Sequence, residues 1–238
     1  MDNKTTKTLR ERLIEAVLGQ VGKGVYVWGG NGEPLTDLSE AERFVKSRET
    51  SAENARRAMR LIERRFRDGF KEIRAFDCSG LVFWALKGLG IQKTDVSSRW
   101  LYALCDPIAE ADLCPGDLVF HHDGTQIVHV GVCVGTEQVE CRGRDVGVVR
   151  NRRKKGYWNR FGRLKAFLDT EQAYVVIKGG SVRVREGDGT GTRCVGIAHR
   201  GERYPLIGRA PSGWYRIERN GTEAYITNKP QYTEVRYG

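Results

Sequence analysis

The chain has 238 residues, of which 39% are hydrophobic and 29% charged, an ordinary composition for one large globular domain or two small ones. Its formal net charge of +10 favours contact with polyanions, but no nucleic-acid recognition motif is present, so no specific nucleic-acid partner is expected. No stretch approaches the roughly 20 apolar residues that cross a bilayer, so no membrane span is expected. The six cysteines are irregularly spaced, which favours free thiols over a disulfide framework.

The N-terminal segment is predicted to form an amphipathic helix over residues 9–21. Its apolar positions recur at helical spacing between charged residues: Leu9, Leu13, Val17 and Val21. A secretory signal needs an uninterrupted apolar stretch, which this pattern lacks, so the sequence indicates no export route.

Residues 33–74 are predicted to be mostly helical, because capping-box patterns begin at Ser39 and at Thr50. An apolar stripe at helical spacing follows: Ala55, Met59, Ile62 and Phe66. A further helix is predicted over residues 78–89, where Gly90 follows as a stop signal.

The pattern then changes to strands. Alternation over residues 127–134 places four valines on one face and His129, Gly131 and Cys133 on the other. Residues 138–142 are predicted to form a partner strand. Beyond a join near residues 169–171, short β-type runs alternate with glycine turns and long amphipathic helices are missing, so residues 172–238 are predicted to form a small all-β domain.

Cys78 is the most chemically suggestive residue. It follows Asp77, a favourable N-cap, and begins the predicted helix. The positive end of a helix dipole stabilises a thiolate, and the free N–H groups of the first turn bind an oxyanion. A cysteine in such a position is more often an inert core residue, so the setting alone makes Cys78 only a candidate nucleophile.

His129 is the candidate base, although a histidine in a valine-rich strand is more often a satisfied core residue. Gly131 on the same face leaves room beside its ring. Glu140, on the following strand, is placed to accept a proton from the second imidazole nitrogen and to orient the base. Residues 105–122 hold two cysteines and two histidines, but no CxxC or HxxxH pair is present, so no metal site is expected.

At these residues the chain resembles the NlpC/P60 family, papain-like cysteine peptidases that cut cell-wall peptides. The resemblance covers residues 10–168. It rests on four motifs in matching order: Tyr26-Val27-Trp28-Gly29-Gly30, Phe76-Asp77-Cys78-Ser79-Gly80-Leu81-Val82, Pro115-Gly116-Asp117-Leu118-Val119-Phe120 and His129-Val130-Gly131-Val132. It implies an α+β fold in which helices pack on an antiparallel sheet, and it implies no cofactor.

The resemblance also implies roles for single residues. The nucleophile falls on Cys78, the base on His129, and the third polar residue on Glu140, where family members often have histidine. Four further residues are expected to bind substrate: Tyr26 and Trp28 by lining the site, and Asp77 and Ser79 by holding the free amino end.

One departure from the family is large. A short loop usually separates the glycine pair from the nucleophile, whereas here a helical insertion at about residues 33–74 intervenes. Two interpretations stay open: the insertion narrows the cleft, or it is a surface addition without a role in catalysis.

Residues 172–238 resemble a bacterial SH3 domain, a small barrel that often follows wall hydrolases and binds peptidoglycan. The match runs through Ser181–Arg185, Gly213–Ile217 and Asn220–Ile226. Trp214 and Tyr225 are its candidate ligand aromatics, and Trp214 is more often a packing residue.

Together these resemblances predict a catalytic domain at residues 1–168 and an SH3-like domain at 172–238. The expected function is hydrolysis of the peptidoglycan stem peptide at the bond from γ-D-glutamate to diaminopimelate or lysine, by a monomer acting at the bacterial wall or on wall fragments. The alternative is a catalytically inert wall-binding protein on a papain-like scaffold. The sequence does not decide between diaminopimelate and lysine, or between the cell's own wall and another's.

Overall fold

The computed structural model describes residues 7–168 and 172–237. The chain divides after Phe167 into two compact units, which are described separately. In neither described range is any helix long and apolar enough to cross a membrane.

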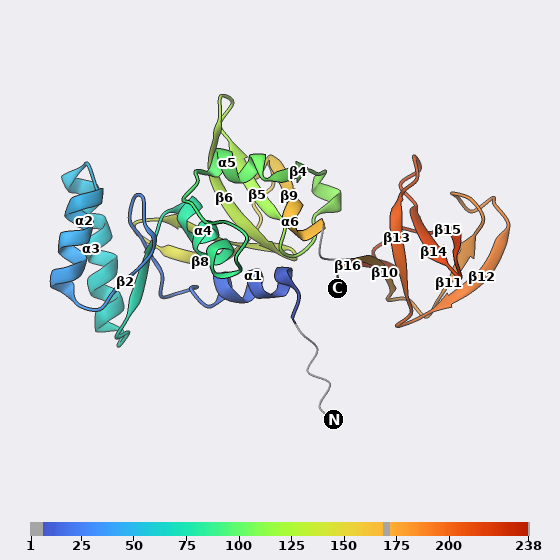
Figure 1. Cartoon of the computed structure of the whole chain (residues 1–238), viewed down its shortest axis with the longest axis horizontal. Coiled ribbons are helices and arrows are strands. Elements are labelled where there is room, and N and C mark those ends of the chain that lie inside the picture. Colours follow the sequence, from blue (N-terminus) through green and yellow to red (C-terminus); the bar gives the residue numbers. More distant parts are fainter. Residues whose placement is uncertain (1–6, 169–171, 238) are drawn as a thin grey trace. The chain divides into compact units, whose positions relative to one another are not determined.

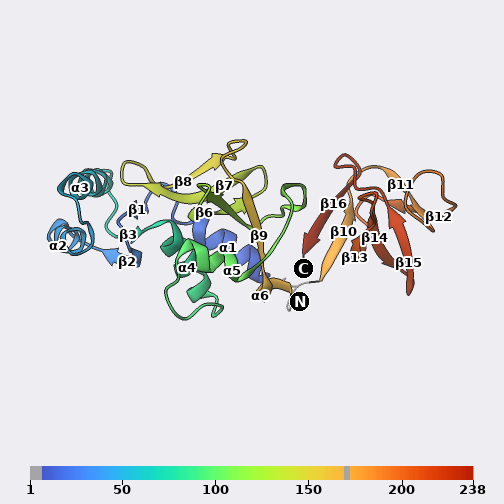
Figure 2. The same cartoon turned by 90° about the horizontal axis from the view of Figure 1, so that it is seen from above.

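The core of the first unit is a six-stranded antiparallel sheet in the order β4-β9-β5-β6-β7-β8. Its strands are β4 (Cys105–Pro107), β5 (Leu118–His122), β6 (Ile127–Val134), β7 (Glu137–Gly143), β8 (Gly147–Arg152) and β9 (Arg160–Leu164). The helices are α1 (Leu9–Leu18), α4 (Cys78–Gly88), α5 (Ser98–Ala103) and α6 (Lys165–Leu168), with a 3-10 turn at Glu110–Asp112. Helices α1, α4 and α5 contact β6 and lie together on one face of the sheet (Figure 2). This is the predicted arrangement of helices on an antiparallel sheet.

Helix α1 is shorter than predicted. It begins after Thr8, whose side chain caps the helix, and ends at Leu18. Val21, the last residue of the expected apolar stripe, is 36% exposed, because the chain has turned away from the helix at that point. Leu13 and Val17 are fully buried against the main core, so the stripe is correct over the helix itself.

A buried ion cluster joins α1 to the sheet. Asp117, which is fully buried, accepts hydrogen bonds from Arg10 (2.8 Å) and from Arg163 (3.0 and 2.8 Å). It also accepts the backbone N–H of Cys114 at 2.8 Å. A buried carboxylate is tolerated only when it is paired and hydrogen-bonded in this way, so Asp117 of the Pro-Gly-Asp motif has a structural role.

The second sheet of this unit is small and carries the insertion. Its strands run in the order β1-β3-β2, with β1 (Val25–Tyr26) parallel to β3 (Ile73–Phe76) and β2 (Asn31–Leu35) antiparallel to it. Helices α2 (Leu38–Arg48) and α3 (Ala52–Arg67) lie side by side next to β2 (Figure 1). They form a separate apolar core with β1 and β3.

The prediction of a mostly helical segment at 33–74 was therefore wrong at both ends, where β2 and β3 pair with each other. The predicted helix starts were also displaced. Asp37 caps α2 and Ser51 caps α3, each by accepting a backbone N–H three residues on. Asp37 lies two residues before the expected cap Ser39, and Ser51 directly follows the expected cap Thr50. Asp and Ser are both favourable N-caps, so the capping-box patterns placed both helix starts at the wrong residue.

The second unit is all-β, as predicted. Its strands are β10 (Ala173–Ile177), β11 (Ser181–Arg185), β12 (Cys194–His199), β13 (Arg203–Arg209), β14 (Tyr215–Arg219), β15 (Thr222–Ile226) and β16 (Thr233–Tyr237). They form one sheet in the order β12-β11-β15-β14-β13-β10-β16 around a core that includes Val175, Val184 and Ile217. Within residues 172–237 no strand pairing joins β12 to β16, so the expected closed barrel is not found.

Candidate active site

Cys78 is the first residue of α4, as the sequence predicts. Asp77 caps the helix by accepting the backbone N–H of Gly80 at 2.7 Å. The Cys78 side chain is half-buried at the edge of the main core. Its position at a helix N-terminus gives it the positive dipole end and the free N–H groups that favour an anion.

The Asp77 carboxylate is occupied by internal hydrogen bonds. Besides Gly80, it accepts the Ser79 hydroxyl (3.0 Å) and the backbone N–H of Gly29 (3.0 Å). Burial raises the pKa of Asp77 more than these hydrogen bonds lower it. Asp77 therefore holds the Gly29 turn against the start of α4, and the substrate role expected for Asp77 and Ser79 stays a prediction.

Gly80 lets that turn approach the helix. A Cβ atom at this position would lie 1.8 Å from the carbonyl oxygen of Gly30. Because the contact is with backbone, a larger residue forces α4 and the turn apart. The glycine of the Cys-Ser-Gly motif thus fixes where Cys78 stands relative to Tyr26 and Trp28.

We expect Gly80→Ala to destabilise the chain by about 1–3 kcal/mol and to reduce activity. Thermal unfolding and a cleavage assay measure the two effects. Gly88→Ala is the matched control, because Gly88 closes the same helix and a Cβ there meets nothing within 4 Å. If Gly80→Ala and Gly88→Ala have the same unfolding temperature and the same cleavage rate, the close approach of the Gly30 carbonyl to α4 does not matter for stability or activity.

His129 and Glu140 form a buried pair on neighbouring strands. His129 Nε2 lies 2.7 Å from Glu140 Oε2, with the two side chains 11% and 5% exposed. The other oxygen, Oε1, accepts the side-chain amide of Gln138 at 2.9 Å. A Cβ at Gly131 would lie 3.1 Å from the Val139 carbonyl oxygen and 3.4 Å from both Glu140 Cβ and the Trp158 ring, so little space is left for a side chain at this position.

The pair changes how both groups hold protons. Burial lowers the pKa of His129, but hydrogen bonding to Cys78 and to Glu140 outweighs it and raises the pKa to about 9. Burial raises the pKa of Glu140, and the hydrogen bonds from His129 and Gln138 outweigh it, so the net direction is down. With Nε2 taken by Glu140, Nδ1 is the ring nitrogen left for Cys78. The structure therefore brings together all three residues that the sequence put forward.

An aromatic wall behind the base was not predicted. The His129 ring stacks on Trp158, with centroids 5.5 Å apart and planes at 23°. Tyr157 stacks on His121, with centroids 4.2 Å apart, and its carbonyl oxygen lies 2.7 Å from His121 Nδ1. Tyr157 and Trp158 lie just before β9. Their place beside His129 depends on the order of the strands in the sheet, which local sequence patterns do not reveal.

Tyr26 lies near Cys78, and Trp28 follows two residues later in the chain. Tyr26 ends β1, opposite Phe76, and is 8% exposed. Burial, with the nearby Cys78 and Asp77 groups next in importance, raises the pKa of Tyr26. Trp28 is 59% exposed, so its side chain is open to solvent.

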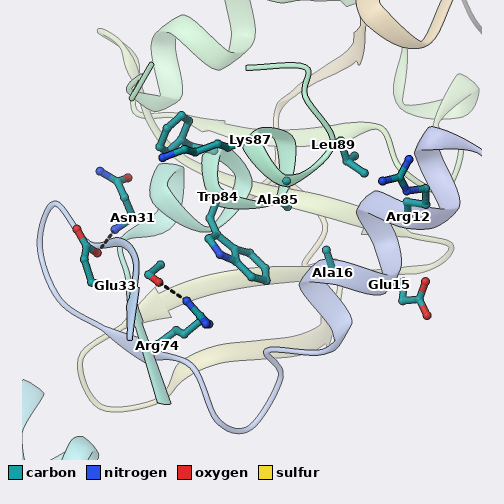
Figure 3. Close-up of a pocket in the computed structure, with 13 residues that line it drawn as sticks. Arg12, Glu15, Ala16, Asn31, Glu33, Arg74, Trp84, Ala85, Lys87 and Leu89 are labelled. Carbon is teal, nitrogen blue, oxygen red and sulfur yellow. Dashed lines mark hydrogen bonds between the residues drawn. The ribbon is translucent and has the colours of Figure 1, made fainter. Parts of the chain in front are cut away.

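Two of the pockets in the first unit lie apart from Cys78 and His129. One, of about 760 Å³, is lined by residues of α1, β2, β3 and α4, with Trp84 and Arg74 on its wall (Figure 3). The other, of about 800 Å³, lies between α2 and α3. Neither is lined by Cys78 or His129. Among residues 7–168 and 172–237, no group of three or more His, Cys, Asp or Glu side chains is arranged to hold a metal ion, and no disulfide joins the six cysteines.

A half-buried cysteine at a helix N-terminus, beside a buried histidine–carboxylate pair, has the make-up of a cysteine-nucleophile site. Residues 63–163 match the model of the NlpC/P60 family. The match begins within α3 and includes Cys78, His129 and Glu140. It does not include α1, β1 or α2.

Known proteins resemble part of the chain. The bifunctional muramidase/DL-endopeptidase CwlT of Bacillus subtilis is 27% identical over 157 residues, which are 58% of this chain and 47% of CwlT. The probable endopeptidase p60 of Listeria grayi is 30% identical over 109 residues, 46% of this chain and 21% of p60. This chain thus spans about half or less of these relatives' length.

Two solved structures are also similar to part of the chain. The peptidoglycan hydrolase RipB of Mycobacterium tuberculosis matches with 22% identity and a TM-score of 0.45, over 66% of this chain and 64% of RipB. RipD of the same organism, described as a non-catalytic NlpC/p60 domain protein adapted to peptidoglycan binding, matches with 18% identity and a TM-score of 0.45, over 67% of this chain and 99% of RipD.

Proposed function

We propose that the protein is a cysteine endopeptidase that hydrolyses the stem peptide of bacterial peptidoglycan. The observation that carries the proposal is the buried His129–Glu140 pair beside Cys78, with the pKa of His129 raised to about 9. A histidine that is protonated at neutral pH and hydrogen-bonded to a cysteine favours the thiolate, which is the nucleophilic form.

In the proposed reaction, the Cys78 thiolate attacks the scissile carbonyl and forms the C–S bond. The first-turn N–H groups of α4 stabilise the oxyanion. Protonated His129 gives its proton to the leaving amine, and the C–N bond breaks. Neutral His129 then takes a proton from water, whose oxygen attacks the thioester; the acid is released and the proton returns Cys78 and His129 to their starting state.

Within the proposal, the bond is that from γ-D-glutamate to diaminopimelate or lysine, by resemblance to the family and to CwlT, whose name includes DL-endopeptidase. Tyr26 and Trp28 line the acyl side of the cleft, and Asp77 and Ser79 border it. Residues 172–238 are proposed as an SH3-like wall-binding unit. The protein acts at the bacterial wall or on wall fragments.

The test is digestion of a panel of defined muropeptides followed by mass spectrometry of the products. The panel includes diaminopimelate and lysine stems, and stems with a free or a blocked N-terminal alanine. We expect two product fragments separated at the γ-D-glutamyl bond. Intact substrates throughout the panel would contradict the proposal.

A second candidate is an inert wall-binding protein with the same scaffold. Glu140 at a position where the family often has histidine is the observation that favours it. Such a protein co-sediments with purified wall sacculi without releasing peptide fragments, so the same mass-spectrometric assay separates the two functions.

A further inference from the structure

A buried side chain of the insertion contacts segments next to the candidate active site. Glu49 is the C-cap residue of α2, and its side chain is only 1% exposed. It accepts two hydrogen bonds from the Arg144 guanidinium, from Nε at 2.9 Å and from Nη2 at 2.7 Å. It also accepts the backbone N–H of Trp28 at 3.0 Å. A buried carboxylate is thus held by two segments that border Cys78.

Arg144 in turn lies on the wall of the site. Its guanidinium carbon is 4.9 Å from the centroid of the Tyr26 ring, a cation–π geometry. Tyr26 pairs with Phe76, two residues before Cys78, and the following turn is clamped to Asp77. The positive charge is therefore fixed on the Tyr26 side of the nucleophile.

One nitrogen of the Arg144 guanidinium, Nη1, does not bond to Glu49. Nε and Nη2 occupy the edge that faces Glu49, so Nη1 points away from it. Within the described ranges no hydrogen bond involves Nη1, and the Arg144 side chain is 16% exposed. A guanidinium fixed on one edge and open on the other has already lost its rotamer freedom, so it binds an anion with a smaller entropic cost.

We propose that Arg144, positioned by Glu49, is a specificity residue that binds a free carboxylate of the substrate. The inference rests on the proposed function, in which Tyr26 lies on the acyl side of the cleft. The acyl residue there is γ-linked glutamate, whose own α-carboxylate lies a few bonds from the attacked carbonyl. The substrate class is thus stem peptides with a free glutamate α-carboxylate, in preference to those in which it is a carboxamide.

The test uses two synthetic stem peptides that differ only in carboxylate or carboxamide at this position. We expect the wild type to favour the carboxylate peptide in kcat/KM by about tenfold or more, chiefly through KM, since a charge-assisted hydrogen bond is lost with the carboxamide. Arg144→Gln alone removes the ion pair of Glu49 and leaves its buried carboxylate without a positive charge beside it. The decisive variant is therefore Glu49→Gln/Arg144→Gln, for which we expect a ratio near one.

Asp145→Asn is the matched control. Asp145 pairs with Arg57 of α3 and so also ties the insertion to the β7–β8 turn, but both side chains are exposed. Within the described residues Asp145 makes no hydrogen bond to Arg144, whose positive charge adds to the Arg57 hydrogen bond in lowering the Asp145 pKa. We expect this variant to keep the wild-type ratio. A loss of stability in the double variant without a change in the ratio would show a purely structural role and overturn the inference.

Two further outcomes distinguish a failure of the Arg144 inference from a failure of the proposed peptidase function. Equal cleavage of both peptides by the wild type overturns the role of Arg144 and leaves the peptidase standing. Cleavage of neither peptide overturns the proposed function and the inference with it.

Discussion

Replacing Cys78 with alanine is expected to reduce cleavage of muropeptides by roughly a thousandfold or more, because no other group supplies the nucleophile. Cys78 is half-buried at the edge of the core, so the substitution removes little packing and the unfolding temperature should stay within a few degrees of the wild type. Initial rates on a defined muropeptide and a thermal melt measure both quantities.

Cys194→Ala is the control for this substitution. Cys194 is an exposed thiol on β12 in the second unit, so its loss should leave the rate unchanged. Full activity in Cys78→Ala would mean that the assigned nucleophile is wrong.

Replacing Glu140 with glutamine is expected to move the alkaline limb of the pH–rate profile to lower pH. Protonated His129 is the form that donates to the leaving amine, and its pKa is raised to about 9 partly by Glu140. Without the carboxylate this pKa falls, so activity is lost at a lower pH. We also expect the maximal rate to drop by roughly a hundredfold or more, because the side-chain amide of the Glu140→Gln variant can donate to Nε2 and stabilise the unproductive imidazole tautomer.

The hydrogen bonds of His129 to Cys78 and to Glu140 also make the stability of the folded chain depend on pH. His129 binds its proton more tightly in the folded chain than in the unfolded chain, so this contribution is complete below a pH of about 6.5 and is lost as the pH rises through about 9. Its size is on the order of 3 kcal/mol. Urea titrations at pH 6 and pH 9.5 should show a smaller loss of stability for Glu140→Gln than for the wild type.

Glu137→Gln serves as the control for both measurements. Glu137 lies on the same strand and pairs with Arg150 at the surface, so neither the pH–rate profile nor the pH-dependent stability should change. An alkaline limb in Glu140→Gln identical to that of the wild type would show that the carboxylate does not act on His129.

Local chemistry predicted the start of α4, because aspartate is a favourable N-cap and Asp77 caps the helix that Cys78 begins. It gave Cys78, His129 and Glu140 only as candidates, and their assignment to one site came from the family resemblance. The structure places His129 and Glu140 within hydrogen-bond distance.

The walls of the site depend on contacts far apart in the sequence. Glu49 and Arg144 are 95 residues apart, and each alone resembles an ordinary surface charge. Trp158 comes against His129 only because β9 pairs with β5 beside β6. No local rule encodes such pairings, which is also why β2 and β3 were missed at the ends of the insertion.

The most direct test of the Cys78–His129–Glu140 site is the rate of alkylation of each cysteine by iodoacetamide at pH 6, read by peptide mapping. Burial raises the pKa of Cys105 to about 12 and also raises those of Cys133 and Cys141, so these thiols should stay protonated and unreactive. Exposed Cys194 is the reference for an ordinary accessible thiol. We expect Cys78 to react at least about tenfold faster than Cys194 and to lose this advantage in His129→Ala. A Cys78 that reacts no faster than Cys194 would contradict an activated nucleophile.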